Sequence, residues 1–223
     1  MDTDRWATFR GRSTPAPDRD RAYLEGVHGQ MDPVLEEMLR EGRAESIPVV
    51  QPAVGRLLRV LVTAHAPMRV VEVGTAIGFS TLWMAGGLPE GGVIETIDPD
   101  LSRTERARAY WRRAGVEQKI RVTNRPALQV LPEMAPGVEF AFIDALKPEY
   151  MAYLDALLPK MTPGGMIAVD NLLWSGRIAA GEHDPDTDAL RAFNQRFLHE
   201  PQLVSTILPV GDGFGLGVII PHA

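Results

Sequence analysis

The stretch Val70-Val-Glu-Val-Gly-Thr-Ala-Ile-Gly-Phe-Ser80 decides the fold, because a short apolar run breaks into a glycine turn and then into a helical pattern. The pattern, which continues through Thr81–Leu88, predicts a strand, a tight turn and a helix. Gly74 and Gly78 would let the backbone turn sharply and approach a ligand, and the start of a helix presents N–H groups and the positive end of its dipole. We therefore expect a negatively charged small molecule at this turn.

A second apolar run, Val93–Asp98, ends in an acid about twenty residues further on. A carboxylate in this position can grip the hydroxyls of a ribose, so the two segments together indicate a nucleoside-cofactor pocket. The spacing Gly74-x-x-x-Gly78 differs from the Gly-x-Gly-x-x-Gly of dinucleotide binders, which favours a cofactor without a pyrophosphate. The alternative is that the glycines only form a turn between strand and helix.

Size and composition point to one α/β domain that acts on small molecules. The chain has 223 residues, of which 45% are hydrophobic, and this is enough to bury a full core. The formal net charge of −6 argues against nucleic-acid and membrane partners, which require a positive field. The chain has no cysteine, which excludes disulfides and thiolate metal sites. With no apolar run of membrane-spanning length and no targeting pattern, we expect a cytoplasmic protein.

The order of elements predicts a parallel sheet with helices on both faces. We expect residues 1–20 to be a flexible N-terminal segment and 21–223 to be a single domain, in which 21–62 form a helical cap. Strands and helices then alternate, and two last strands joined through Gly211-Asp-Gly213 predict a closing antiparallel hairpin. Pro163-Gly-Gly165 predicts a turn, and 175–186 a polar loop before a last helix at Asp188–His199.

Three oxygen-bearing side chains stand where predicted strands end. Asp144 follows one strand, and Asp170 and Asn171 follow another. The carboxyl ends of parallel strands form the ligand crevice, so we expect the three to converge there. Carboxylate and amide oxygens suit Mg²⁺, Mn²⁺ or Ca²⁺ rather than Zn²⁺. The alternative is that each residue only caps the loop or helix that follows.

Two further side chains lie close to these ligands in the sequence. Lys147 is three residues past Asp144, where neighbouring cations would lower its pKa and make it a general base. It can also be read as an ordinary solvated lysine. Trp174 follows the Asp-Asn pair and could stack on a flat substrate, or it could be a surface or core tryptophan.

These motifs resemble those of the cation-dependent class I S-adenosylmethionine O-methyltransferases, the family of the caffeoyl-CoA and catechol O-methyltransferases. The similarity runs from about Tyr23 to Ile220 and is most specific in Glu72–Thr81, Phe142–Lys147 and Asp170–Trp174. The resemblance implies a Rossmann-like fold with a mostly parallel seven-stranded sheet and a C-terminal antiparallel hairpin. It also implies S-adenosylmethionine and a divalent cation as cofactors, and a homodimer.

The resemblance assigns roles to individual residues. The residues that it implies for the methionine part of the cofactor are Glu72, Gly74, Thr75 and Ser80, with Val50 packing nearby. It implies that Asp98 binds the ribose and that Ala127 offers its backbone N–H to the adenine. Asp144, Asp170 and Asn171 would hold the metal, and Asp144 also belongs to the catalytic and cofactor-binding sets. Lys147 would be the base and, with Trp174, would contact the substrate.

The expected activity is methyl transfer to a hydroxyl of a catechol-like small aromatic molecule. Another small-molecule hydroxyl, such as that of a polyketide phenol, a hydroxamate or a CoA-ester phenol, stays open as the acceptor. A nicotinamide oxidoreductase is disfavoured by the glycine spacing, and a non-catalytic module by the presence of every motif residue. The chain departs from the family pattern at Leu146, where plant members carry a second Asp, and at Arg125, which replaces a glycine.

Overall fold

The computed structural model describes residues 17–220, and its contacts divide the chain after Pro33 into two units. The first unit contains helix α1 (Pro17–His28), whose apolar side chains Tyr23, Leu24 and Val27 are exposed. Most of the segment 1–20 lies outside the described residues, and α1 begins within its last four positions. The expected division into a flexible segment and one domain therefore stays a prediction.

The second unit is built on a seven-stranded sheet in the order β3-β2-β1-β4-β5-β7-β6. The strands are β1 (Arg69–Val73), β2 (Val93–Ile97), β3 (Ile120–Thr123), β4 (Val138–Ile143), β5 (Met161–Val169), β6 (Leu203–Leu208) and β7 (Phe214–Ile219). The first five run parallel, and β7 is antiparallel to both β5 and β6. The predicted fold class, including the closing hairpin, is confirmed.

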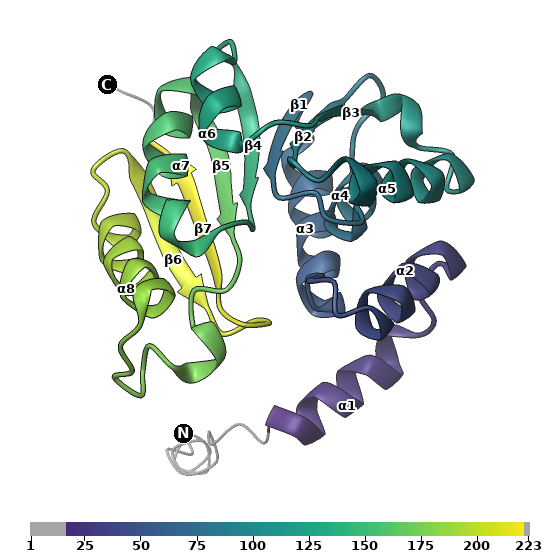
Figure 1. Ribbon diagram of the computed structural model, residues 1–223, viewed down its shortest axis with the longest axis horizontal. Coiled ribbons are helices and arrows are strands. Elements are labelled where there is room, and N and C mark those ends of the chain that lie inside the picture. Colours follow the sequence, from purple (N-terminus) through teal and green to yellow (C-terminus); the bar gives the residue numbers. More distant parts are fainter. Residues whose placement is uncertain (1–16, 221–223) are drawn as a thin grey trace, which may run out of the picture. The chain divides into compact units, whose positions relative to one another are not determined.

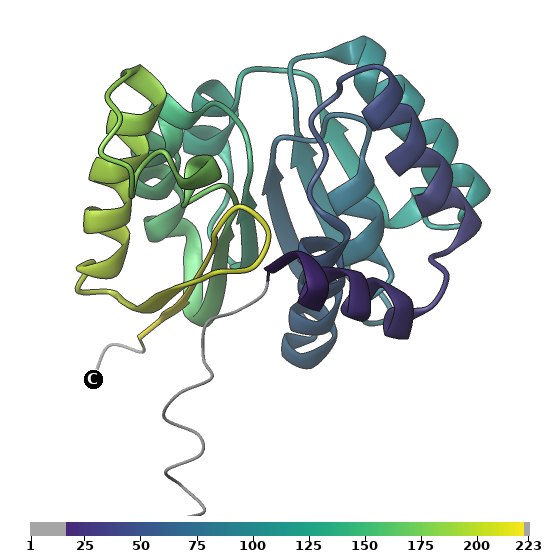
Figure 2. The same cartoon turned by 90° about the horizontal axis from the view of Figure 1, so that it is seen from below.

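Helices cover both faces of this sheet (Figures 1 and 2). One side carries α3 (Pro52–His65), α4 (Phe79–Ala85) and α5 (Leu101–Arg113), and the other carries α6 (Ala127–Val130), α7 (Tyr150–Leu157) and α8 (Pro185–Leu198). Short 3₁₀ turns lie at Glu117–Lys119, Leu131–Glu133, Lys147–Glu149, Leu158–Lys160 and Trp174–Gly176. Because side chains alternate along a strand, β4 buries Ala141 and Ile143 toward α7 and α8 and directs Phe140 and Phe142 to the opposite face.

Helix α2 (Pro33–Ala44) is tied to α5 by a row of charged contacts. Arg113 pairs with Glu37 at 2.6 Å, and Arg106 bonds both Glu41 and Glu45, the latter at 2.8 Å. The partners recur every four residues on the α2 side and every seven on the α5 side, so each set occupies one face of its helical segment. Leu35 and Met38 on α2 are buried. Apolar contacts and ion pairs thus fix α2 and the segment that follows it.

Three predicted boundaries are wrong. Pro163-Gly-Gly165 is not a turn but an irregular part of β5, because Val138 pairs with Met161 and Phe140 already pairs with Met166. The helix after the glycine turn ends at Ala85, since the chain continues as Gly86-Gly87. Helix α8 begins at Pro185 because the Asp184 carboxylate accepts hydrogen bonds from the backbone N–H groups at its start.

Candidate functional site

Four residues directly past the strand ends lie in one row along the carboxyl edge of the sheet. Each donates its backbone N–H to the last carbonyl of a neighbouring strand, and the bonds are 2.9–3.2 Å long. The pairs are Gly74 with Ile97, Asp98 with Thr123, Asp144 with Val73, and Asp170 with Ile143. Strands β1 and β4, which carry Gly74 and Asp144, flank the position where the strand order reverses. This position is the usual ligand crevice of an open parallel sheet.

Lys147 connects the residues that were predicted to bind a metal. Its Nζ lies 3.0 Å from Asp144 Oδ1 and 2.6 Å from Asn171 Oδ1. Asp170 is adjacent, with 3% of its surface exposed, and its carboxylate accepts the N–H of Asn171 at 2.8 Å. The structure therefore brings together two carboxylates, an amide oxygen and the predicted base.

Burial and like charge together raise the pKa of Asp170 to about 7. Burial is the larger cause and the charge of Asp144 the second, while the N–H of Asn171 and the charge of Lys147 act in the opposite direction. Above about pH 7, where Asp170 is ionised, two carboxylates with one ammonium leave an excess of negative charge in a site with little solvent. Such a site favours the binding of an additional cation.

Two site residues escaped the sequence analysis. Tyr150 is buried, and its hydroxyl accepts a hydrogen bond from Lys147 Nζ at 2.8 Å and donates one to the carbonyl of Asp170 at 3.2 Å. The spacing of three between Lys147 and Tyr150 was the available signal, because it places both on one side of a helical turn. Asp212, in the turn between β6 and β7, accepts the N–H of Ser175 and adds to the negative charge around Asp170. In the sequence, Asp212 lies between two glycines, and this pattern indicated only a hairpin turn.

Trp174 lies in a strained loop beside Lys147. Asn171, Trp174 and Ser175 all have positive φ angles, of 67°, 50° and 53°, which non-glycine residues rarely adopt. The Trp174 ring is half-buried, lies 5.7 Å from Lys147 Nζ, and its Nε1 has no hydrogen-bond partner among the described residues. A buried donor without a partner is available to an acceptor atom of a ligand.

The two glycines of the turn are required by packing within the protein. A Cβ on Gly74 would stand 2.0 Å from the carbonyl oxygen of Asp144, and one on Gly78 would stand 2.4 Å from the Trp111 ring. Both have positive φ angles, and Gly78 is the residue directly before α4. The predicted close approach to a ligand is not tested by these contacts. They do show that the glycine turn and Asp144 touch.

Glu72 is enclosed beneath the turn. Its carboxylate has no exposed surface and accepts hydroxyl hydrogen bonds from Ser80 at 2.6 Å, Thr81 at 2.5 Å and Thr96 at 2.7 Å. Thr75 extends the network through its contact with the Thr96 hydroxyl at 2.6 Å. Burial raises the pKa of Glu72 to about 7, although the three hydroxyls oppose the shift. In this structure Glu72, Thr75 and Ser80 support the turn from inside.

Asp98 holds the same turn from the side of β2. Its Oδ2 accepts the backbone N–H groups of Thr75 at 3.1 Å and Ala76 at 2.8 Å, and its Oδ1 accepts that of Asp100 at 2.9 Å. Each carboxylate oxygen has about two acceptor positions, so Asp98 retains room for a ribose hydroxyl. The predicted ribose ligand is thus at the carboxyl edge and also has a structural role.

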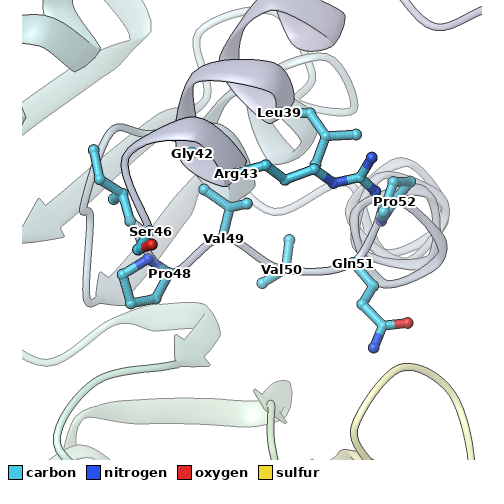
Figure 3. A pocket seen from close by; sticks show the side chains of 10 residues that line it. Leu39, Gly42, Arg43, Ser46, Pro48, Val49, Val50, Gln51 and Pro52 are labelled. Carbon is cyan, nitrogen blue, oxygen red and sulfur yellow. The ribbon is translucent and has the colours of Figure 1, made fainter.

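Val50 and Ala127, the other residues predicted to lie near the cofactor, belong to two different segments. Val50 is buried and lines a pocket of about 360 Å³ between the end of α2 and residues 46–52, together with Arg43, Ser46 and Gln51 (Figure 3). Within residues 17–220 this pocket is not lined by Lys147 or by any predicted metal ligand. Ala127 is the buried first residue of α6. Neither position tests the predicted contact with a cofactor.

The two departures from the family pattern are both exposed. Leu146 is 64% exposed beside Lys147, and Arg125 pairs with Glu133 at 2.7 Å at the start of the α6 region. Arg125 is therefore accommodated by an ion pair outside the core. Leu146 places an apolar surface next to the predicted base.

The donor set fits a hard divalent cation. No group of three or more His, Cys, Asp or Glu side chains suited to a metal occurs within residues 17–220, so two carboxylates have to be completed by the amide of Asn171. Oxygen ligands of this kind match Mg²⁺, Mn²⁺ or Ca²⁺, and their uncompensated charge favours such an ion.

Within residues 17–220, no helix is long and apolar enough to cross a membrane.

The sequence and the fold of this chain are similar to those of known O-methyltransferases. The family model described as O-methyltransferase matches residues 27–219. The catechol O-methyltransferase of Mycobacterium tuberculosis is 36% identical over 211 residues, covering 91% of this chain and 96% of that protein. The caffeoyl-CoA O-methyltransferase of Populus kitakamiensis is 32% identical, with 86% of each chain covered. The crystal structure of an O-methyltransferase from Bacillus cereus in complex with SAH has a TM-score of 0.81 and 30% identity, covering 89% of this chain and 96% of the other.

Proposed function

Since the chain belongs to the O-methyltransferase family, we propose that it transfers a methyl group from S-adenosylmethionine to a hydroxyl of a catechol-like small aromatic acceptor, with Mg²⁺ as the preferred cation. The relatives with catechol and caffeoyl-CoA activities, and the neighbour in complex with SAH, support the reaction class and the cofactor. The acceptor, the cation and a homodimer are parts of the proposal.

One observation carries the proposal: Lys147 Nζ bonds both Asp144 and Asn171 at the edge where the glycine turn meets Asp144. The residues that we propose as base, oxygen ligands and cofactor turn therefore lie next to one another at this edge. A transfer reaction needs this arrangement because the donor and the acceptor must be held in contact.

Different residues of the site would hold the cation, hold the cofactor and accept the proton. Asp144, Asp170 and Asn171 would hold the cation through oxygen atoms, and the turn from Gly74 to Ser80, with Asp98, would hold the cofactor. When bound, S-adenosylmethionine supplies a methyl group on a sulfonium, and a divalent cation lowers the pKa of an acceptor hydroxyl. Lys147 Nζ would take the hydroxyl proton, and Trp174 would orient the aromatic ring. No covalent enzyme intermediate is required.

A catechol-like acceptor fits this site better than an isolated alcohol. Three protein ligands leave coordination positions open for oxygen atoms of the acceptor, and two vicinal hydroxyls fill two of them. The half-buried Trp174 ring and the exposed Leu146 offer apolar contact to a flat molecule.

The test is methyl transfer to acceptors with and without vicinal hydroxyls, measured with Mg²⁺ and with EDTA. We expect turnover of the vicinal diol alone, and its loss in EDTA. Asp170→Asn should reduce turnover by roughly 100-fold or more, because even residues that only orient metal ligands carry effects of up to this size. Asp155→Asn, on the exposed side of α7 where Asp155 pairs loosely with Arg196, is the matched control.

The outcomes separate the parts of the proposal. Full activity in EDTA, or in Asp170→Asn, would exclude the cation. Equal turnover of monohydroxy acceptors would replace the catechol by another small-molecule hydroxyl. Failure of S-adenosylmethionine to bind in a calorimetric titration would refute the proposed reaction altogether.

A further inference from the structure

The ammonium of Lys147 bridges two of the three proposed cation ligands. It lies within hydrogen-bond distance of an oxygen from two of the three proposed ligands, at 3.0 Å from Asp144 and 2.6 Å from Asn171. The third contact, at 2.8 Å, is to the hydroxyl of Tyr150. An ammonium has three N–H donors, and here all three have an acceptor.

The surroundings of this ammonium form an enclosed site. Only 11% of the Lys147 side chain is exposed. The rings of Tyr150 and Trp174 lie 4.9 Å and 5.7 Å from Nζ, so that aromatic faces and oxygen atoms together surround the charge. Tyr150 is itself fixed, because it is fully buried and its hydroxyl donates to the carbonyl of Asp170. The lysine is thus held in a defined position and is not a solvated surface group.

We propose that Lys147 is a tethered competitor for the divalent cation: in the cation-free protein its ammonium bridges Asp144 and Asn171, and cation binding requires it to leave these oxygens. The inference rests on the proposed function, since it takes these residues as ligands. Asp144 Oδ1 and Asn171 Oδ1 each keep a second electron pair, but a divalent ion on either oxygen would lie close to the Nζ that bonds it, and the repulsion between the two positive charges opposes binding of both.

The arrangement would couple the base to the cation. Without a divalent ion, the ammonium lies beside Asp144 and its three N–H groups all have acceptors within the site. With a cation on these oxygens, Lys147 would stay near them through its short connection to Asp144 in the sequence, and its ammonium would have to give one proton to solvent before Nζ could accept the proton of an acceptor hydroxyl. The chain would then present its base only when the site is loaded.

The competing explanation is that Lys147 repels a cation only through its charge, wherever its Nζ lies. Two variants distinguish the explanations. Lys147→Met removes both the charge and the bridge, whereas Tyr150→Phe keeps the charge and removes one of the three contacts that hold Nζ in place. Lys160→Met is the control, because Lys160 is a partly exposed lysine whose Nζ bonds the carbonyl of Pro132, away from the site.

The experiment measures Mn²⁺ affinity from the electron paramagnetic resonance signal of free Mn²⁺, with no substrate present and with thermal melts to verify folding. Lys147→Met should bind Mn²⁺ about tenfold tighter or more, because each charge-assisted hydrogen bond that no longer has to be broken is worth roughly that factor. Tyr150→Phe should bind about threefold tighter, and Lys160→Met should equal the wild type.

The inference is overturned if Lys147→Met binds Mn²⁺ no tighter than the wild type. It is also overturned if Lys147→Met binds tighter while Tyr150→Phe does not, since charge alone would then explain the competition. Absence of Mn²⁺ binding in the wild type and all variants would remove the cation from the proposed function and this inference with it. Binding by the wild type with equal affinities in the variants would remove the inference alone.

Discussion

Replacing Glu72 by Gln should make the protein more stable at pH 8 and nearly unchanged at pH 5. The pKa of Glu72 is raised from 4.5 to about 7 by complete burial, so the folded protein holds a proton that the unfolded chain releases. Stability therefore falls as the pH rises from about 4.5 to about 7, and the loss is complete above that range. A pKa difference of about 2.5 corresponds to about 3 kcal/mol.

The neutral amide that Glu72→Gln introduces does not ionise, so the variant should lack this loss. At pH 5 the wild-type carboxyl is protonated, so in both proteins the hydroxyls of Ser80, Thr81 and Thr96 face a neutral group with a carbonyl oxygen, although the amide offers two donors and the carboxyl one. The difference between variant and wild type should then grow by about 2–3 kcal/mol in favour of the variant between pH 5 and pH 8.

Urea unfolding of both proteins at several pH values measures this difference. Taking the difference removes the contribution of Asp170, which titrates in the same range in both proteins. Glu90→Gln is the control, because Glu90 is exposed. A difference that does not change with pH, or a variant that is less stable at pH 8, would show that Glu72 is ionised in its buried network and refute the reasoning.

Two further predictions concern the packing that supports the site. Gly74→Ala should lower the free energy of unfolding in urea by more than about 3 kcal/mol, because a φ of 100° adds strain to a Cβ contact of 2.0 Å with the Asp144 carbonyl oxygen. Gly115→Ala is the control and should lower it by about 1 kcal/mol, because Gly115 has a φ of 70° and its Cβ would meet no atom within 4 Å. Equal losses in the two variants would disprove the contact. A double-mutant cycle on Arg106 and Glu45 should give a coupling of about 0.5 kcal/mol that at least halves in 1 M NaCl, and a coupling insensitive to salt would contradict a solvent-exposed ion pair between α5 and the residue that follows α2.

The sequence predicted the layout of the site well because parallel strands impose it. Once alternation indicated a parallel sheet, residues directly past the strand ends had to meet at one edge. Asp98, Asp144 and Asp170 could therefore be grouped from their positions alone, and the backbone bonds at this edge confirm the grouping. The resemblance then supplied roles that position alone could not.

The sequence was less informative where the outcome depends on side-chain partners from different elements. Glu72 was predicted to face the cofactor, and its enclosure by hydroxyls from α4 and β2 cannot be derived from a local pattern. Tyr150 was missed for the same reason, since its role depends on where Lys147 Nζ points. Pro163-Gly-Gly165 was misread because a local turn signal does not reveal that a neighbouring strand can pair around the irregularity.

Gly74 connects the glycine turn to the residues that we propose as cation ligands. Its α-carbon lies so close to the carbonyl of Asp144 that no side chain fits between them, and the hydrogen bond from Asp144 N–H to the Val73 carbonyl joins the ends of β1 and β4. Asp144 in turn bonds Lys147, which bonds Asn171 after β5. A displacement at the turn would therefore reach the base and the ligands through three direct contacts. The loop after Asn171 and the hairpin turn lie beside this connected set, and the hydrogen bond from Ser175 N–H to Asp212 joins the two.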